Sequence, residues 1–309
     1  DAATTDDYNT AVGYQSLSGV TGTNNNHNSA LGYGSGAGLT TGLQCVAIGS
    51  KALQTHTTGS RNIAIGHQAM FDTDAGSTSL GSTDNIFIGK DAGGGTWADA
   101  ASSSNIGIGN YCMDGAMNGA SENKAVGYAA LGALTSGDEN TVIGFQAGDA
   151  VTTENSLTLV GQNAGGAINS NDANGTVAIG KSALGSLTSG ERNIAIGYEA
   201  AGALTTGNNN TIMGYRAFDA AIDTESNNVA IGTYAMGSVD QGSHATADVD
   251  DNVAIGYQAM LGGDFGSGNT NMINNVAIGS WTMDGTGSYE AKYNTFVGGE
   301  AGGGTWGAA

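Results

Sequence analysis

A short motif recurs along the whole chain and constrains the fold more than any other feature. It reads Asn-x-Ala-(Ile/Val)-Gly-x-x-Ala and occurs in sixteen copies, spaced 17 to 24 residues apart. The copies extend from Asn9 to the end of the sequence, so we expect one tandem-repeat domain over residues 1–309, with 17–24 residues per coil. The marker glycines of the copies are Gly13, Gly32, Gly49, Gly66, Gly89, Gly109, Gly127, Gly144, Gly161, Gly180, Gly197, Gly214, Gly232, Gly256, Gly279 and Gly298.

The three residues before each marker glycine have the character of a β-strand. The first of them is β-branched in fourteen copies, and the third is apolar in all sixteen. Such a short strand is not stable alone, but strands of successive copies can stack in parallel. The sequence therefore predicts an all-β fold, a parallel β-solenoid of about sixteen coils with helix content near zero. A fixed glycine after each strand indicates a positive φ or a close backbone approach.

Both sides of the strand are apolar, which bears on assembly. Side chains alternate along a strand, so Val229 and Ile231 share one face while Asn228 and Ala230 share the other. The column of Ala230 is apolar or glycine in all sixteen copies. We expect the face of Ile231 and Ile196 to fill the coil and the alanine face to contact a neighbouring copy of the chain about a symmetry axis. The predicted assembly residues are Ala195, Ala230 and Ala254.

An asparagine column precedes the strands. Asparagine stands four residues before the marker glycine in thirteen copies, and Cys45, Leu157 and Thr176 replace it in the others. Stacked asparagines form hydrogen-bonded ladders in other parallel, in-register assemblies. We therefore expect a structural ladder. Its members include Asn62, Asn193, Asn228 and Asn252.

The run from Asn228 to Gly232, together with Ala235, resembles the head repeat of YadA-type trimeric autotransporter adhesins, Asn-Ser-Val-Ala-Ile-Gly-x-x-Ser. The form with Gly-Tyr-Gln-Ala, as from Gly256 to Ala259, resembles repeats of bacteriophage tail and surface fibres. The resemblance implies a left-handed parallel β-roll that assembles as a homotrimer outside a cell or on a virion. The minimum period here is longer than in the adhesin heads, and their serine column is mostly alanine in this chain.

Composition narrows the partners. Asp and Glu outnumber Lys and Arg by 28 to 8, giving a net charge of −20, which disfavours nucleic acid and anionic membranes as partners. No apolar run approaches the roughly 18 residues of a membrane span, so we expect no membrane insertion. The sequence favours an extracellular structural and adhesive fibre on a cell or virion surface, with a host glycan or protein as receptor. Whether it is a bacterial adhesin or a phage fibre stays open.

Catalytic motifs are lacking. The four histidines are far apart in the sequence and lack the spacing of a zinc site. No nucleophile elbow occurs in a strand–turn–helix context. Cys45 and Cys112 occupy repeat columns, and we expect no disulfide between them. We therefore expect no enzyme, no metal and no cofactor. The alternatives are a ligand-binding solenoid of the ice-binding type and a polysaccharide-cleaving phage depolymerase, which needs facing carboxylates.

Variable segments are the candidates for recognition. The longest insertions are Phe71 to Ser82, Gly237 to Asp248 and Leu261 to Asn271. Loops on a rigid scaffold commonly carry binding, so we expect receptor contacts at Phe71, His244 and Phe265. Six tyrosines directly follow a marker glycine. We interpret them as a stacked aromatic column, with a carbohydrate-contact stripe as the alternative. Acidic clusters at Asp72/Asp74 and from Asp248 to Asp251 are interpreted as solvated loop charge, with Ca²⁺ binding as the alternative.

Overall fold

The computed structural model describes residues 8–21, 26–73, 81–98, 100–220, 224–238, 249–262, 271–285 and 290–304. The chain divides into two compact units, Asp1–Ser156 (unit 1) and Leu157–Ala309 (unit 2), each described by itself. Within the described ranges, the regular elements are short β-strands and one turn of 3-10 helix, η1 (Asn171–Ala173), and there is no α-helix. The predicted all-β class is confirmed.

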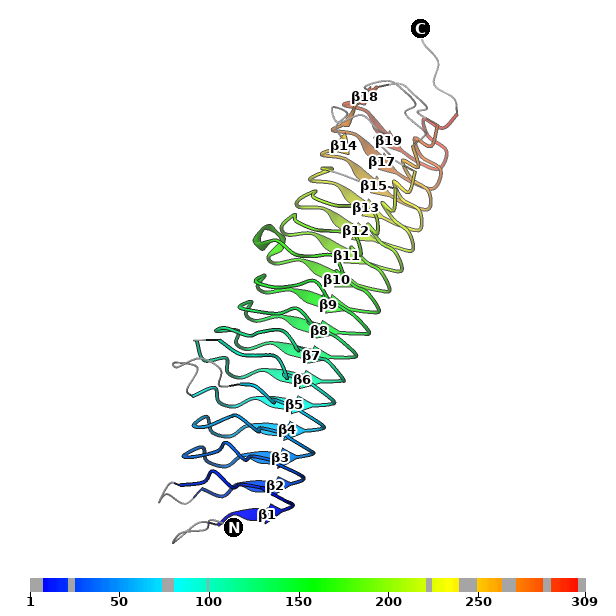
Figure 1. The fold of residues 1–309 in the computed structure, drawn as a ribbon. Helices are drawn as coiled ribbons and strands as arrows, with labels where there is room; N and C mark the ends of the chain where they lie inside the picture. Colours follow the sequence, from blue (N-terminus) through cyan, green and yellow to red (C-terminus); the bar gives the residue numbers. More distant parts are fainter. Residues whose placement is uncertain are drawn as a thin grey trace. The chain divides into compact units, whose positions relative to one another are not determined.

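Unit 1 contains eight strands of three residues each, stacked in parallel (Figure 1). Equivalent repeat positions face each other from strand to strand, so that Ala47 pairs with Ala64 and Ala64 with Phe87. The repeat therefore sets the register directly. The strands are β1 (Thr10–Val12), β2 (Ser29–Leu31), β3 (Val46–Ile48), β4 (Ile63–Ile65), β5 (Ile86–Ile88), β6 (Ile106–Ile108), β7 (Lys124–Val126) and β8 (Thr141–Ile143).

Unit 2 repeats the arrangement with eight further parallel strands, and a second sheet of two-residue strands lies in its last coils. The predicted parallel β-solenoid is thus present in both units. The main strands are β9 (Thr158–Val160), β10 (Val177–Ile179), β11 (Ile194–Ile196), β12 (Thr211–Met213), β13 (Val229–Ile231), β15 (Val253–Ile255), β17 (Val276–Ile278) and β19 (Thr295–Val297). The second sheet comprises β14 (Val249–Asp250), β16 (Met272–Ile273) and β18 (Ala291–Lys292).

The number of turns is slightly smaller than expected. The marker count predicts about sixteen coils, but a turn is complete only when one strand is joined to the next. In the described residues the two units together make about thirteen turns.

The marker glycines have the two properties that the sequence predicts for them. All sixteen have φ between 129° and 148°. A Cβ atom placed on Gly66 would lie 2.2 Å from the carbonyl oxygen of Gly89 in the next coil, and one on Gly197 would lie 2.2 Å from that of Gly214. A side chain at this position is excluded both by the backbone conformation and by the neighbouring coil.

Three more positions of the coil adopt the left-handed conformation: the second and the fourth residue after the marker glycine and, in every coil but the first, the fifth residue before it. Most of them are not glycine: Glu199 has φ of 50° and Leu53 has φ of 51°. Left-handed residues at this spacing turn the chain away from the strand and bring the fourth residue into the core. Leu53, Met70 and Leu131 at that position are fully buried.

Two positions of the coil fill the core together, and the sizes of their side chains are related. The middle strand residue and the fourth residue after the marker glycine share the same interior space. Where the middle residue is large, as in Phe87, the partner position is Gly93, and a Cβ atom there would lie 2.8 Å from the Phe87 ring. Where the middle residue is Ala64, the partner position holds the fully buried Met70. In these coils a larger residue at one position is thus offset by a smaller one at the other.

The predicted assignment of the two strand faces is wrong. Ala195, Ala230 and Ala254 are fully buried within the single chain, so they line the inside of the coil and cannot contact a partner. Ile196 and Ile231 instead point outward and are only partly buried. The physical reason is space, because residues of the following turn already occupy the interior and leave room for only a methyl group on most strands.

The predicted asparagine ladder is present inside the coil. The backbone amide of Asn228 donates to Oδ1 of Asn210 at 3.0 Å, and the amide of Asn252 donates to Oδ1 of Asn228 at 3.1 Å. Asn228 Nδ2 also donates to the carbonyl oxygen of Val249 at 2.7 Å. Asn193 is joined to Asn210 in the same way. Each asparagine therefore satisfies backbone groups of neighbouring coils that would otherwise be buried without partners.

Candidate functional site

The first candidate surface is the outward side of the main strands, which we call the strand face: the first and third residues of β1–β8 in unit 1 and of β9–β13, β15, β17 and β19 in unit 2. Ile143 and Met213 on it are 44% and 43% exposed. Lys124 is the one charged residue among these thirty-two positions, and none is acidic, although the chain has 28 acidic residues. A predominantly apolar strip with a single charged residue is unusual on the surface of a soluble monomer.

Aromatic ladders lie at the corner that follows the strand. In unit 1, the ladder comprises Lys90, Tyr111, Tyr128 and Phe145. The Lys90 ammonium lies 4.6 Å from the centroid of Tyr111 and bonds its hydroxyl. Tyr111 meets Tyr128 edge to face at 5.6 Å, and Tyr128 stacks on Phe145 at 5.2 Å. The stacked aromatic column expected from the sequence therefore exists.

Unit 2 carries an equivalent ladder of Lys181, Tyr198, Tyr215 and Tyr234. Lys181 lies 5.6 Å from the centroid of Tyr198, which stacks on Tyr215 at 5.4 Å. Tyr215 meets Tyr234 edge to face at 5.5 Å. Tyr198 and Tyr215 remain 37% and 44% exposed, so both side chains are partly accessible to solvent. Rings packed in this way form a rigid wall that is apolar at its edges and polar at its tips.

An ionic cluster adjoins the unit-2 ladder. Arg216 Nε lies 2.7 Å from Glu199 Oε2, and Nη2 of the same arginine lies 2.6 Å from that oxygen. Hydrogen bonds from the Tyr198 hydroxyl and from Arg216 hold the pKa of Glu199 below its usual range. Asp219 lies 3.9 Å from Arg216 Nε, but burial raises the pKa of its carboxyl. Both carboxyl groups thus lie beside Arg216, but the pKa of Glu199 is below its ordinary value and the pKa of Asp219 is above it.

A cavity of about 340 Å³ opens beside this cluster on the turns of unit 2, and we call it the turn pocket. It is formed by three positions of successive coils: the second, fifth and sixth residues after the marker glycine. Its size is at the lower end of the range for small-molecule sites. The residues that line it are Asn163, Ser182, Gly185, Ser186, Glu199, Gly202, Ala203 and Asp219. Sequence reasoning missed it, because its polar residues come from four coils with no common motif.

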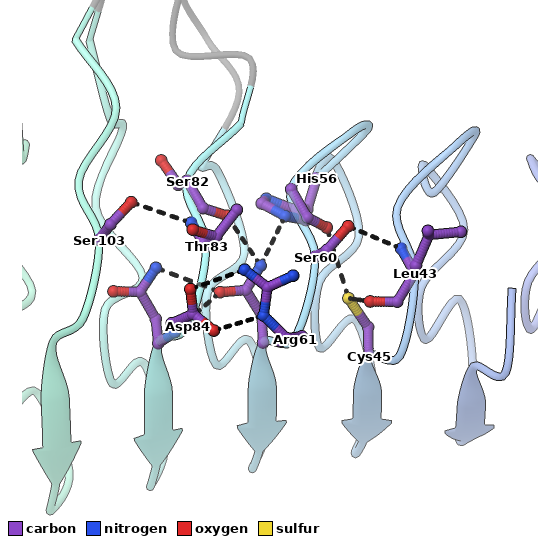
Figure 2. A network of polar contacts seen from close by, with 12 residues as sticks. Leu43, Cys45, His56, Ser60, Arg61, Ser82, Thr83, Asp84 and Ser103 are labelled. Atoms are coloured by element: carbon purple, nitrogen blue, oxygen red, sulfur yellow. Dashed lines mark hydrogen bonds and ion pairs between the residues drawn. The ribbon is translucent and has the colours of Figure 1, made fainter.

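A polar network surrounds the buried His56 in unit 1 (Figure 2). Oδ1 of Asn62 accepts from the amide of Asn85, so Nδ2 of Asn62 faces His56 Nε2 as a donor at 2.9 Å. The Nδ1 atom of His56 lies 2.8 Å from the Thr73 hydroxyl and therefore carries the ring proton. His56 is a neutral structural member of the ladder region, with both ring nitrogens engaged.

The same network contains an exposed ion pair and one of the cysteines (Figure 2). Arg61 and Asp84 pair across two coils, with 2.6 Å between Nε and Oδ1. Cys45, which replaces an asparagine of the ladder, donates its thiol to the carbonyl of Gly59 at 3.4 Å. Cys45 and Cys112 are both free and buried. Burial raises the pKa of the Cys112 thiol to about 12, so this group stays protonated and unreactive at neutral pH.

The predicted receptor residues are only partly covered by the structure. Phe71 is half-buried at the end of a turn, and Lys51 lies 5.5 Å from the centroid of its ring. His244 and Phe265 lie outside the described residues, as does most of each insertion that was expected to bind.

The acidic clusters are also only partly covered by the described residues. Asp72 accepts hydrogen bonds from the hydroxyls of Thr55 and Thr96, and Asp250 accepts one from the amide of Ser226, whereas Asp74 and Asp248 lie outside the described residues. In the described ranges, no three His, Cys, Asp or Glu side chains gather closely enough to hold a metal ion. Within those ranges there is also no helix that is long and apolar enough to span a membrane.

Comparisons of the chain with known protein families, with curated proteins and with solved structures found no match.

Proposed function

We propose that the chain is a segment of a rigid extracellular fibre that assembles as a homotrimer through its strand face and mediates attachment, on a bacterial surface or on a virion. The observation that carries this proposal is the strand face itself: in each unit it is an in-register, predominantly apolar strip with no acidic residue, in a chain of net charge −20.

The strand face fits a second copy of the chain better than it fits solvent. Partly exposed residues such as Ile48 and Val126 in unit 1 and Ile278 in unit 2 leave apolar surface open along the strand face of each unit. Contiguous apolar surface beyond about 300–600 Å² is rare on a monomer and marks an interaction site. Three parallel copies around an axis along the stack would bring their strand faces together and leave the acidic turns in water. The left-handed coil and the trimeric state follow from the adhesin and phage-fibre resemblance.

Sedimentation tests this assembly. We expect the unmodified chain to sediment as a trimer, and Ile196→Glu combined with Ile231→Glu to yield folded monomers, because six acidic charges would meet at the axis. Ser18→Glu places a charge on an exposed turn and serves as the control, with an unchanged trimer. A stable monomer of the unmodified chain would refute the proposal, and so would a trimer that survives both strand-face substitutions.

A second candidate, polysaccharide cleavage, is favoured by one observation. Glu199 and Asp219 line the same pocket, and their pKa values are displaced in opposite directions, as in acid–base pairs of glycosidases. It ranks second because Arg216 and Tyr198 already bind the Glu199 carboxylate. These contacts engage the oxygen with which Glu199 would act as a nucleophile or base. Release of reducing ends from a polysaccharide by the unmodified chain, abolished by Asp219→Asn, would promote this candidate above the first.

A further inference from the structure

The turn pocket of unit 2 combines three features that together suit a ligand. It is a cavity of about 340 Å³, its lining offers hydroxyl, amide and carboxylate groups, and Glu199 connects it to the exposed aromatic ladder through Tyr198. The ladder of unit 1 combines the same kinds of contact in a different order. It lacks a counterpart of the Arg216–Glu199 pair, because Ala129 and Gln146 stand at the equivalent positions.

We propose that the turn pocket and the unit-2 ladder together bind a neutral glycan. Sugar hydroxyls would donate to the carboxylates of Glu199 and Asp219 and to the amide oxygen of Asn163, and would accept from the hydroxyl of Ser182. The apolar C–H groups of the sugar would lie against the rims of Tyr198 and Tyr215.

The chemistry of the site selects a polyhydroxylated ligand. Carboxylates and amides satisfy adjacent sugar hydroxyls, whereas an apolar ligand would displace water from these groups without replacing its hydrogen bonds. The wall of Tyr198 and Tyr215 is already ordered by ring stacking, so that contact costs little conformational entropy on binding.

The charges of the site select a neutral ligand. Lys181 and Arg216 balance Glu199 and Asp219, so the site itself carries no net charge. The chain around it carries −20, which repels acidic polysaccharides. The pocket is built from turn residues and not from the first and third strand residues, so it stays accessible when the strand face is covered.

This inference names the attachment ligand of the proposed fibre and rests on that function, but its test is separate. The full chain is titrated calorimetrically with the neutral hexasaccharides cellohexaose, maltohexaose and chitohexaose, and with hexagalacturonate as the acidic counterpart. We expect at least one neutral probe to bind and hexagalacturonate not to bind. Tyr215→Ala and Asp219→Asn should each weaken binding at least tenfold, because each removes a contact to the sugar.

Tyr128→Ala is the matched control, since it removes the central ring of the unit-1 ladder. It should change affinity less than twofold. Circular dichroism melting curves verify that all variants are folded, and sedimentation of the same samples reports on assembly, so that loss of binding by an intact trimer overturns only the glycan site. The inference is overturned if no neutral probe binds at millimolar concentration, if hexagalacturonate alone binds, if Tyr128→Ala weakens binding as much as Tyr215→Ala, or if the probe is cleaved.

Discussion

The two sides of the main strands differ in a way that hydrophobicity does not reveal. The inward side carries small residues and asparagines, such as Ala230 and Asn228, which are completely buried. The outward side carries the larger side chains, such as Val229 and Ile231, which remain partly exposed. In most globular proteins the larger aliphatic side chains mark the inside of a sheet. In this narrow coil, the backbone of the following turn lies so close that bulk is excluded from most inner positions.

The comparison shows that volume, and not apolarity, assigns the faces of a strand in a solenoid. A coil of 17 residues encloses a fixed space, which is shared by one strand residue, the ladder asparagine and residues of the next turn. Large strand residues such as Phe87 and Leu159 are matched by a glycine six residues later. Ile212 is an exception, because the fully buried Phe218 stands at that distance. The outer face has no such limit, and β-branched residues there favour the extended conformation.

The largest loss of stability should come from placing a charged side chain on the inner face of a strand. Ala230→Lys places an ammonium group in a closed interior without a partner, and we expect it to lower the free energy of unfolding by more than about 4 kcal/mol. Ile231→Lys, one residue away on the outer face, should cost less than about 1 kcal/mol in the single chain and should weaken self-association. Urea denaturation measures both. Equal losses of stability would mean that the faces are not distinguished as described.

The next largest effect should come from changing the sizes of the two side chains that share the interior at Phe87 and Gly93. Phe87→Ala should cost about 3–5 kcal/mol by leaving a cavity, and Gly93→Leu should cost a similar amount by colliding with the Phe87 ring. The double variant recreates the pairing of the buried Ala47 with Leu53 two coils earlier, so we expect it to recover at least about 2 kcal/mol of the summed loss. Additive losses in a double-mutant cycle would contradict the compensation between the two positions.

Much of the fold was predictable because the repeat encodes it locally. The marker glycines, exemplified by Gly66, impose the same turn in each coil, and register follows from stacking equal turns. The ladder was predictable because asparagine at a fixed position in a parallel stack has few other roles. The faces were assigned wrongly because alternation shows which residues share a side but not which side is inside.

The signal that would have corrected the faces is in the sequence. Phe87 with Gly93 and Leu159 with Gly165 each pair a large strand residue with a glycine six residues later, whereas strand alanines are mostly followed at that distance by leucine or methionine. Such covariation within one chain indicates shared interior space. The turn pocket could not be found in this way, because it depends on left-handed residues such as Glu199, whose conformation comes from the coil and not from their own preference.

A smaller loss is expected when the ladder is interrupted where an asparagine now stands. Asn228→Leu imitates the residue that the chain itself uses at Leu157. It would leave the amide of Asn252 and the carbonyl of Val249 without those partners, at a cost of about 2–3 kcal/mol. Asn208→Ala at the coil rim, which removes a hydrogen bond to the partly exposed amide of Glu191, is the control and should cost about 1 kcal/mol or less. A ladder variant no worse than the rim variant would show that water satisfies these interior groups.

The smallest effect is a pH dependence at Asp114, a partly buried carboxyl on the turns of unit 1. Burial and the neighbouring Asp91 raise its pKa from 3.8 to about 6. The folded chain therefore binds more protons than the unfolded chain between these two values, and the contribution of Asp114 to the free energy of unfolding falls as pH rises through that window. Asp114→Asn removes this penalty. We therefore expect the free energy of unfolding of the variant to exceed that of the parent by about 1 kcal/mol at pH 7.5, after allowance for solvent screening, and to equal it at pH 3.5.

The control for this last effect has the opposite sign. The Arg61 guanidinium beside Asp84 lowers the pKa of that carboxyl, so its stabilising contribution is present at neutral pH and is lost as pH falls below about 4. Asp84→Asn should therefore be less stable than the parent at pH 7.5 and equal to it in strong acid. Urea denaturation of both variants at the two pH values tests the pair together. If Asp114→Asn stabilised the chain equally at pH 3.5 and 7.5, its gain would come from packing and not from relief of a buried charge.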